Sequence, residues 1–483
     1  PSTVNRTVTL AVLENPTVLP KVGNLGQPSG EPSIRRRPAE MDLCFPPIVR
    51  KPAGNALFGL LLVTLSTMAT APPCHSAPPN VLLIISDDQS WTDFGFMGHP
   101  TIRTPHIDRL ARQSAVFPNA YVPSSLCRPS LATMVTGLYP HQHGITGNDP
   151  PRGTDRSKML KHIRAHPTLP RWLATKGYRS LQTGKWWEGH PRLAGFTDAM
   201  THGDPKRGGR HGDLGLKIGR TGLKPIIEFI DDCGETPFFI WYAPFLPHTP
   251  HNPPKRLLDR YRAENRPIEL SRYFAMCTWF DETCGQLLDH LDRKQLSDNT
   301  LVLFVVDNGW IQRTPQTKVP KGWRFRFAPG SKRSPNEGGV RTPIMVRWPG
   351  HLKPGTRQAL ASSIDLAPTI LAATDIRPEK TLPGHNLLAL AAAPHATRKT
   401  IYGEIFAHDV ADIDRPAASL QFRWVRHGGW KLISRPDSTT PQLFNLTNDP
   451  HETRNLAGSQ SDRASRMRRL LDEWWNPARR QSR

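Results

Sequence analysis

The sequence has few cysteines, no hydrophobic run long enough to cross a bilayer and no internal repeat. Six cysteines in 483 residues do not make a disulfide scaffold, and Cys277 and Cys284 are expected to be packed rather than bridged. The uninterrupted apolar run, from Ala56 to about Ala71, is shorter than the roughly 20 residues that a spanning helix needs. Paired Cys/His fingers, a basic zipper and an aromatic RNA-binding signature are also missing. We therefore expect neither a stable membrane span nor a nucleic-acid partner.

The N-terminal region is typical of a targeting segment. Residues 1–40 are rich in Pro, Gly and Arg without apolar periodicity, and we expect a non-native or disordered extension there. From Met41 a basic stretch, the apolar run and a small-residue segment follow in the order of a secretory signal peptide, which we assign to 41–77. The cleavage site stays open, because Ala69 and Ala71 fit an A-x-A pattern but a proline follows. This order predicts a secreted or periplasmic protein.

Positive charge exceeds negative charge over the whole chain. The 63 Lys and Arg residues against 41 Asp and Glu residues give a formal net charge of +22. Such a surface attracts polyanions, which include nucleic acid, anionic lipid and sulfated glycan. The same charge is equally consistent with an effect on solubility or an adaptation to the habitat. Charge alone does not choose the partner.

Three apolar runs end in or shortly before polar residues and are typical of buried strands. They cover residues 80–85, 237–245 and 301–309. Apolar runs of this length suit strands of a parallel sheet that are buried on both faces. Helical stretches are found at 105–115, 129–136, 168–176 and 271–294. The alternation predicts an α/β fold with a large, mostly parallel central sheet flanked by helices.

A smaller unit is expected after the helix near 364–373. Strand-like pieces at 400–406, 420–426 and 429–433 predict a small antiparallel sheet. A C-terminal helix would cover it with an apolar side formed by Met467, Leu470, Leu471, Trp474 and Trp475. We therefore expect a main domain at 79–375 and a C-terminal α+β subdomain at 395–483.

Two of the predicted strands end in residues that suit a metal ion. Asp87 and Asp88 follow the first strand, and Asp307 and Asn308 follow the strand at 301–309. Together they offer an all-oxygen set for a hard divalent cation. The alternative is that the aspartates cap a helix and that Asp-Asn-Gly forms an ordinary turn.

The peptide SSLCRPSLATMVTG at 124–137 resembles the signature of the sulfatase family, which belongs to the alkaline-phosphatase superfamily. That signature is Cys-x-Pro-Ser-Arg followed by a short helix and Thr-Gly. The matching residues are Cys127, Pro129, Ser130, Thr136 and Gly137. Further matches run in the family's order, among them PNVLLIISDDQ (79–89), TPHIDRLA (104–111), GYRSLQTGKW (177–186), PFLPHTP (244–250), VVDNG (305–309), EGGVRTPIMVRWPG (337–350), IDLAPTIL (364–371) and LFNLTNDPHETRNLA (443–457). Collinear matches of this number are hard to obtain by accident, so the chain is identified as a member of the formylglycine-dependent type I sulfatases.

The resemblance implies calcium-dependent hydrolysis of sulfate esters by a catalytic domain at 79–375. Cys127 resembles the cysteine that a formylglycine-generating maturation enzyme oxidises to an aldehyde, whose hydrate attacks sulfur. Asp87, Asp88, Asp307 and Asn308 resemble the ligands of one Ca²⁺, together with the modified Cys127.

The resemblance also assigns roles to three further side chains. Lys185 and Lys332 resemble the pair of lysines that bind sulfate oxygens, and a compact ammonium group suits that task. Lys332 could instead be a solvated loop charge. His248 resembles the histidine that protonates the departing alcohol or contacts the sulfate, and His251 is a close competitor.

The sequence departs from the family pattern at two positions. Leu131 stands where the signature has arginine, and Arg128 is the residue that could replace that arginine. Trp187 stands where the family usually has a histidine after GKW. The candidates for a replacement imidazole are His190, His211, His141 and His143.

The most favoured substrate is a sulfated carbohydrate. Trp310, Trp323, Arg324 and Arg326 could stack on a sugar and pair with anions, or could simply pack within a loop. A phosphonate or phosphate ester hydrolase with the same residues is one alternative. An inactive homologue that binds sulfated glycans is another, suggested by Leu131, Trp187 and the basic charge.

Overall fold

The computed structural model describes residues 77–208, 213–393, 398–436 and 440–478. The predicted extension 1–40 and all but the last residue of the predicted signal peptide 41–77 lie outside the described residues. Described residues from 77 onward belong to one compact unit. No helix within these ranges is long and apolar enough to cross a membrane.

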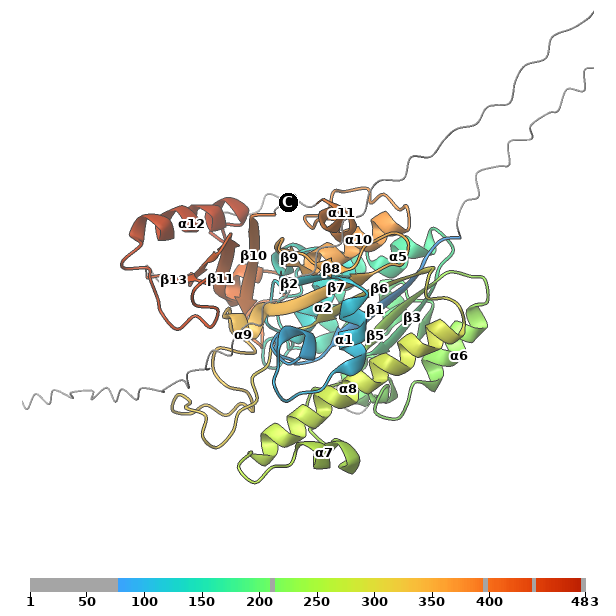
Figure 1. Cartoon of the computed structure of the whole chain (residues 1–483). Coiled ribbons are helices and arrows are strands. Elements are labelled where there is room, and N and C mark those ends of the chain that lie inside the picture. Colours follow the sequence, from blue (N-terminus) through green and yellow to red (C-terminus); the bar gives the residue numbers. More distant parts are fainter. Residues whose placement is uncertain (1–76, 209–212, 394–397, 437–439, 479–483) are drawn as a thin grey trace, which may run out of the picture. The chain divides into compact units, whose positions relative to one another are not determined.

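A nine-stranded sheet forms the centre of the described unit (Figure 1). Its strands are β1 (Asn80–Ser86), β2 (Ala115–Tyr121), β3 (Arg179–Gly184), β4 (Asp198–Ala199), β5 (Phe238–Ala243), β6 (Thr300–Val306), β7 (Arg341–Arg347), β8 (Gly355–Thr356) and β9 (Ala361–Ser362). They are ordered β4-β3-β5-β1-β6-β7-β2-β8, with β9 also paired to β2. All neighbours run parallel except β7, which is antiparallel to both β6 and β2. The predicted α/β class with a mostly parallel sheet is confirmed.

Helices cover both faces of this sheet (Figure 1). In chain order they are α1 (Pro105–Arg112), α2 (Cys127–Thr136), α3 (Pro140–His143), α4 (Lys161–Ala165), α5 (Leu169–Ala174), α6 (Lys224–Cys233), α7 (Lys255–Tyr261), α8 (Ile268–Arg293), α9 (Glu337–Val340), α10 (Leu366–Ala373) and α11 (Leu387–Ala392). One apolar cluster joins the sheet to α2, α5, α10 and α11, and a second joins it to α1, α6 and α8.

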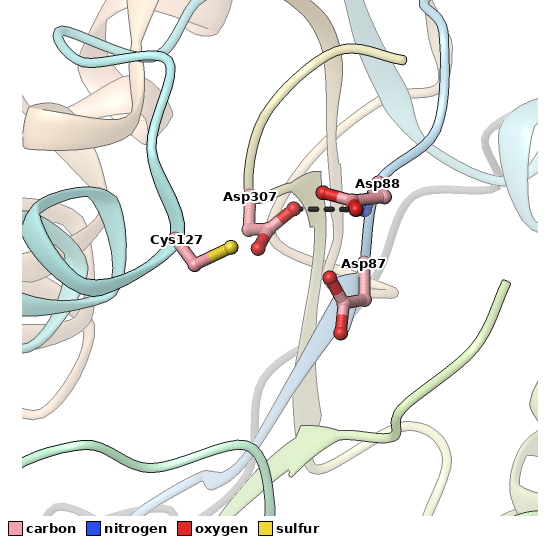
Figure 2. Close-up of side chains that lie close together, drawn as sticks. All are labelled: Asp87, Asp88, Cys127 and Asp307. Atoms are coloured by element: carbon pink, nitrogen blue, oxygen red, sulfur yellow. Dashed lines mark hydrogen bonds between the residues drawn. The ribbon is translucent and has the colours of Figure 1, made fainter. Parts of the chain in front are cut away.

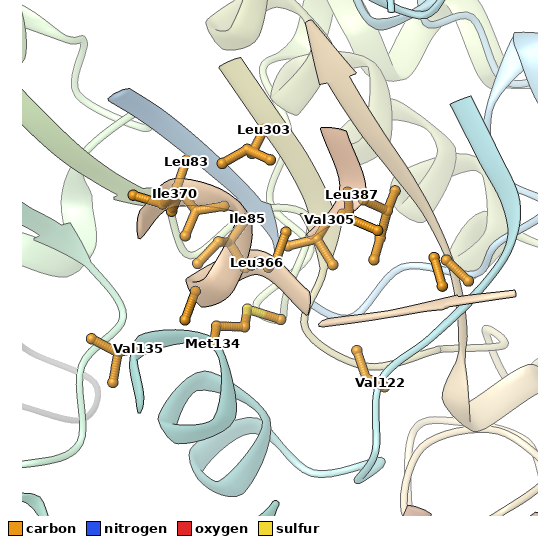
Figure 3. Packing of buried hydrophobic residues seen from close by; sticks show 14 of the residues in the cluster. Leu83, Ile85, Val122, Met134, Val135, Leu303, Val305, Leu366, Ile370 and Leu387 are labelled. Carbon is orange, nitrogen blue, oxygen red and sulfur yellow. The ribbon is translucent and has the colours of Figure 1, made fainter. Parts of the chain in front are cut away.

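The side chains of β1 show how the two clusters share one strand. Leu83 and Ile85 point into the first cluster, where they pack near Leu366 and Ile370 of α10 (Figure 3). Leu82 and the other alternate side chains of β1 point into the second cluster. Because successive side chains leave a strand on opposite faces, only an uninterrupted apolar run can bury both faces.

A second, antiparallel sheet of four strands follows the last helix of the main sheet. It contains β10 (Thr400–Phe406), β11 (Leu420–His427), β12 (Trp430–Ser434) and β13 (Gln442–Asn445), paired in chain order. Helix α12 (Ser461–Trp474) buries Met467 and Leu471 against Val425 and Leu432 of this sheet. Trp475 follows the helix end and stacks on the His141 ring, with centroids 4.5 Å apart. The small antiparallel sheet and its covering helix were predicted, but its fourth strand, β13, was not.

The expected helix at 105–115 was wrong at its C-terminal end. Helix α1 stops at Arg112, and strand β2 begins at Ala115. This strand was not predicted, because Pro118 interrupts its apolar pattern and the pairing with β7 shifts between Phe117 and Ala120.

The domain limits 79–375 and 395–483 stay predictions. Cys277 and Cys284 are buried free thiols, as are the other two cysteines of the described ranges.

Candidate active site

The neighbouring strands β1 and β6 deliver acidic residues to one end of the sheet. They are parallel and in register, with Ser86 opposite Val306, so Asp87 and Asp307 leave the sheet at the same level. The Asp307 amide also donates to the Ser86 carbonyl over 2.9 Å. This edge is where α/β sheets hold their ligands, because loops from several strands converge there.

The backbone at Asp88 explains how two consecutive aspartates reach one site. Side chains at successive strand positions point to opposite faces. Asp88 has a φ of +59°, a left-handed conformation that ends the strand and turns the chain; aspartate tolerates this conformation better than most residues. The Asp88 amide then donates to Asp307 Oδ1 over 3.0 Å, and Asn308 Nδ2 donates to Asp88 Oδ1 over 2.7 Å. All of these groups are buried.

Cys127 is the first residue of helix α2 and lies beside the carboxylates. One carboxylate oxygen each from Asp87, Asp88 and Asp307, together with Cys127 Sγ, lie within 4.8 Å of one another. Figure 2 shows the sulfur pointing toward Asp307 across the gap from β1. Cys127 is only 2% exposed. The positive end of the α2 dipole therefore faces the same point as the thiol.

Lys185 enters the site from the end of β3. Its Nζ lies 2.5 Å from Asp87 Oδ1 and 3.5 Å from Asp307 Oδ2. The preceding residue must be glycine, because Gly184 has a φ of +75° and a Cβ there would come within 1.8 Å of the Ala243 carbonyl oxygen. This close approach lets the Lys185 amide donate to the same carbonyl over 2.7 Å.

Lys332 reaches the site from the long loop between β6 and α9. Its Nζ pairs with Asp88 Oδ1 and lies 3.1 Å from Cys127 Sγ. The loop is tied to the start of α2, since the amide of Arg333 donates to the Ser125 carbonyl over 2.9 Å. Lys332 is buried and is thus not a solvated loop charge.

His248 completes this group of side chains from the loop after β5. The Asp87 amide donates to the Leu246 carbonyl, which holds the loop against β1. His248 Nδ1 lies 2.7 Å from the Thr249 carbonyl, an acceptor, so Nδ1 is the protonated nitrogen. Its Nε2 faces Asp88 Oδ2 at 3.3 Å. Burial lowers the pKa of His248 well below its usual range, against the opposing effect of Asp88.

Burial and local charge shift the pKa values of the cluster in both directions. Burial raises the pKa of Asp87 well above its usual range, although Lys185 opposes this. Burial would also raise the pKa of Asp88, but the ammonium group of Lys332 and other nearby cations reverse the shift. For Lys185 burial acts to lower the pKa, and Asp87 outweighs it and raises the value. Burial raises the pKa of Cys127, so its thiol stays protonated and is a weak nucleophile.

The cluster fits a divalent cation. Asp87 Oδ2, Asp88 Oδ2 and Asn308 Oδ1 are buried without a hydrogen-bond partner among the described residues. Buried acceptors of this kind are costly unless a cation or a donor compensates them. Carboxylate and amide oxygens are the ligands that hard cations prefer. The sequence predicted these four residues as a set, and the structure brings Asp87, Asp88, Asp307 and Asn308 together.

Arg128 does not point into the cleft. Its Nε and Nη2 donate to the two carboxylate oxygens of Glu188 over 2.5 and 2.7 Å, and Nη1 donates to the Gly147 carbonyl over 3.2 Å. Both charged side chains are buried. One residue along a helix turns a side chain by about 100°, so Arg128 and Cys127 face different neighbours. Leu131, at the position of the signature arginine, packs in the apolar core.

The cleft above the cluster is a cavity of about 210 Å³. Of the predicted residues, Asp88, Cys127, Lys185, His248, Lys332, Trp187, Trp310 and Arg326 line it. The predicted replacement histidines do not. His141 is buried against Glu404, His143 is buried against Thr133, and His190 lines a separate cavity beside Trp187, while His211 lies outside the described residues.

His408 lines the cleft and was missed in the sequence. It follows β10, far along the chain from the other site residues. Its Nδ1 lies 2.5 Å from Asp409 Oδ1, and its Nε2 lies 3.4 Å from Asn148 Nδ2. The only signal was a His-Asp pair directly after a predicted strand. That signal does not tell which sheet edge the strand faces, so the residue could not be selected.

The fold and the site define an α/β protein with a buried cluster of carboxylates and a cysteine that fits a metal ion, and comparison with known proteins identifies its family. The family model described as Sulfatase matches residues 79–376, and one described as N-sulphoglucosamine sulphohydrolase, C-terminal, matches 330–476. N-acetylgalactosamine-6-sulfatase of Rattus norvegicus is 29% identical over 385 residues, which cover 71% of each chain. Arylsulfatase A of Homo sapiens is 26% identical over 468 residues, covering 83% of this chain and 86% of that protein.

The comparison with solved structures agrees with the similarity to sulfatases. The crystal structure of Ps i-CgsB superposes with a TM-score of 0.66 at 25% identity, covering 84% of this chain and 94% of that chain. The chain belongs to the sulfatase family. It is a sulfuric ester hydrolase.

Proposed function

We propose that this sulfatase removes sulfate from a sulfated carbohydrate, with Ca²⁺ as its metal and a formylglycine made from Cys127 as its nucleophile. One observation carries the proposal. Cys127 Sγ lies within 4.8 Å of oxygens from Asp87, Asp88 and Asp307, at the start of a helix and 3.1 Å from Lys332 Nζ. A cysteine that served only to fill the core would not be surrounded by these four charged groups.

Asp87, Asp88, Asp307 and Asn308 are the proposed metal ligands. The partnerless oxygens of three of them support this assignment. Three carboxylates and one amide oxygen suit Ca²⁺ better than Mg²⁺, which is usually held by one or two carboxylates and keeps several waters. A bound cation would supply Lewis-acid stabilisation of charge on the sulfate oxygens.

Conversion of Cys127 to formylglycine would supply an aldehyde at the cleft floor, in place of a protonated thiol. The proposed partner for this step is a formylglycine-generating maturation enzyme, acting on a chain that is exported through the predicted signal peptide. The side chain at position 127 projects from the first turn of α2, so the helix fixes its direction.

Lys185 and Lys332 are proposed to bind the sulfate oxygens. Both ammonium groups are buried and remain protonated next to carboxylates, so they hold fixed positive charge where the transferred group sits. His248 Nε2 is the ring atom that is left to exchange a proton with the departing oxygen, because Nδ1 is committed to the Thr249 carbonyl. To act as the acid the ring would first take up a proton at Nε2, which the carboxylate of Asp88 at 3.3 Å favours. Arg128 is proposed to position the start of α2 through Glu188 rather than to contact the substrate.

The buried charge favours a sulfate ester over a phosphate ester. When a bound divalent cation keeps Asp87, Asp88 and Asp307 ionised, their three negative charges, the two ammonium groups of Lys185 and Lys332 and the cation leave one positive charge. A sulfate monoester carries one negative charge and neutralises it, whereas a phosphomonoester dianion leaves a buried net charge. Unbalanced buried charge is costly.

The cleft walls support a carbohydrate as the group that carries the sulfate. Trp187, Phe245, Trp310 and Phe327 line the cleft, and aromatic rings offer flat apolar faces to a sugar. The similarity to N-acetylgalactosamine-6-sulfatase points to the same class of substrate.

Mass spectrometry of the Cys127 peptide, from protein expressed with a formylglycine-generating enzyme, tests the nucleophile. We expect the mass of formylglycine. Unmodified cysteine in protein that hydrolyses sulfate esters would overturn the assignment.

Hydrolysis of p-nitrophenyl sulfate and p-nitrophenyl phosphate, with and without chelator, tests the reaction. We expect faster hydrolysis of the sulfate, loss of activity after chelation and recovery on adding Ca²⁺. The Cys127→Ala variant should be inactive on both esters and serves as the control. Preference for the phosphate would overturn the proposed reaction.

A further inference from the structure

A groove lined by arginines lies beside the cleft. It has a volume of about 530 Å³, and Arg272 of α8 and Arg313, Arg324 and Arg326 of the loop after β6 line it. Glu269 is the one acidic residue of its lining. The loop itself is strongly basic, with seven Lys and Arg residues and no acidic residue between Asp307 and Glu337.

These arginines are not neutralised by the protein. Within the described ranges none of the four forms an ion pair with a carboxylate. Arg313 donates to the carbonyls of Trp323 and Phe325, each over 3.1 Å, which fixes the loop. Arginines gathered on one groove repel one another unless an anion offsets them, and the planar guanidinium group suits sulfate and carboxylate.

The groove and the cleft share a wall. Arg326 lines both, and the ring of Phe325 in the groove stacks on Phe327 in the cleft, with centroids 5.0 Å apart. Arg333, which lines the cleft, lies over the Phe325 ring at 4.6 Å. A ligand that extends from the cleft past Arg326 would reach the groove.

The cleft is too small to hold a long substrate. Its volume of about 210 Å³ is below the roughly 300 Å³ at which binding pockets for drug-sized ligands begin. The parts of an oligosaccharide that exceed this volume must therefore lie on neighbouring surfaces.

We propose that the arginine groove binds a second anionic group of the substrate, a sulfate or carboxylate on a neighbouring sugar residue. The substrate class is then an oligosaccharide with several anionic groups rather than a monosulfated sugar. This inference rests on the proposed sulfatase function and extends it to the parts of the substrate that do not react.

A competition experiment tests the groove. The double variant Arg272→Gln/Arg324→Gln changes two arginines that do not line the cleft. A heparin tetrasaccharide is used as an inhibitor of p-nitrophenyl sulfate hydrolysis. We expect its inhibition constant to rise about tenfold in the variant, because two charge-assisted contacts are lost. The KM for p-nitrophenyl sulfate should change less than twofold, since this ester carries one anionic group.

A matched variant controls for general surface charge. Arg112→Gln/Arg293→Gln removes the same charge from exposed positions that line neither the groove nor the cleft. We expect both constants to stay within twofold of wild type. An unchanged inhibition constant in the groove variant, or an equal rise in the control variant, would overturn the proposal.

The experiments distinguish failure of the groove proposal from failure of the proposed sulfatase function. Wild-type protein that does not hydrolyse p-nitrophenyl sulfate would count against the proposed function alone. Calorimetry of tetrasaccharide binding to Cys127→Ala protein, with and without the two groove substitutions, then tests the groove without turnover. Equal affinities in the two proteins would refute it.

Discussion

At the scale of single residues, the carboxylates of Asp87, Asp88 and Asp307 define the site. Their oxygens are brought within 4.8 Å of one another and of Cys127 Sγ, away from water. Like charges this close destabilise one another unless cations intervene. Lys185 and Lys332 supply part of the compensation, and the partnerless oxygens leave room for a metal ion to supply the rest.

Asp307→Asn tests the metal site. The amide keeps the acceptor oxygen that the Asp88 and Asn308 amides use but loses a charged ligand. Ca²⁺ at 100 times its dissociation constant should stabilise the wild type by about 2.7 kcal/mol, seen as a rise in Tm. We expect the variant to lose this rise and at least 100-fold of kcat/KM.

Asp375→Asn is the control, since Asp375 is exposed and shares only a 3.7 Å ion pair with Lys176. It should respond to Ca²⁺ as the wild type does. A full Ca²⁺ response in Asp307→Asn would contradict the ligand assignment.

His408→Ala tests whether His408, which lines the cleft but was not predicted from the sequence, takes part in substrate binding. Its ring is held by Asp409 and lines the cleft with Trp187. We expect KM for p-nitrophenyl sulfate to rise about fivefold to tenfold, since a hydrogen bond to a charged group contributes roughly 1.5–3 kcal/mol and part is recovered by water. The Ca²⁺-induced rise in Tm should be unchanged. A loss confined to kcat would show a role in the chemical step instead of in binding.

At the scale of elements, the start of helix α2 is the part of the fold on which the site depends. It presents Cys127, and its amides are held by neighbours: Arg128 N donates to Asn148 Oδ1 over 3.0 Å. The buried pair of Arg128 and Glu188 anchors the same turn. An error of about an ångström here would misplace the side chain that we propose as the nucleophile.

Arg128→Met should destabilise the protein by about 3–5 kcal/mol, because the Glu188 carboxylate stays buried without its partner. The double variant Arg128→Met/Glu188→Leu should recover most of this loss and keep activity within about tenfold of wild type. Urea unfolding and p-nitrophenyl sulfate hydrolysis measure the two effects. A double variant that is stable and binds Ca²⁺ but is inactive would mean that Arg128 acts in catalysis.

At the scale of the whole described unit, buried ion pairs join the second sheet to the site. Lys431 of β12 lies 2.9 Å from Glu337 of α9 and 2.9 Å from Glu452, with all three side chains buried. Glu337 follows the loop that carries Lys332, so the small sheet fixes one end of the segment that reaches Cys127. His408, after β10, enters the cleft from the same sheet.

Lys431→Met should cost about 3–5 kcal/mol of unfolding free energy, since two carboxylates lose their shared cation. We also expect KM to rise, because the loop end at Glu337 is released. Urea denaturation and steady-state kinetics check both. Lys353→Met, at an exposed position, is the control and should leave stability within about 0.5 kcal/mol. A Lys431→Met variant as stable as the wild type would show that the ion pairs of Lys431 contribute little to stability.

Several features of the fold could be predicted because they depend on short stretches of sequence. The uninterrupted apolar runs of β1, β5 and β6 are typical of strands buried on both faces, and they were found in the sequence. Strand β2 was not, because Pro118 breaks its pattern and only its pairing with β7, β8 and β9 makes it a strand. The strand order around β1 follows from long-range packing, which no local pattern encodes.

The sequence by itself predicted the residues that the structure brings together at the cleft: the polar ends of two apolar runs, the cysteine motif and the two lysines. The tertiary structure alone decided that Arg128 pairs with Glu188, that His408 lines the cleft and that four arginines form a groove beside it. The physical reason is the distance along the chain over which each feature is determined. Strand ends and helix starts are set by neighbours in the chain, whereas the direction of a long side chain is set by the charges and cavities that folding brings beside it.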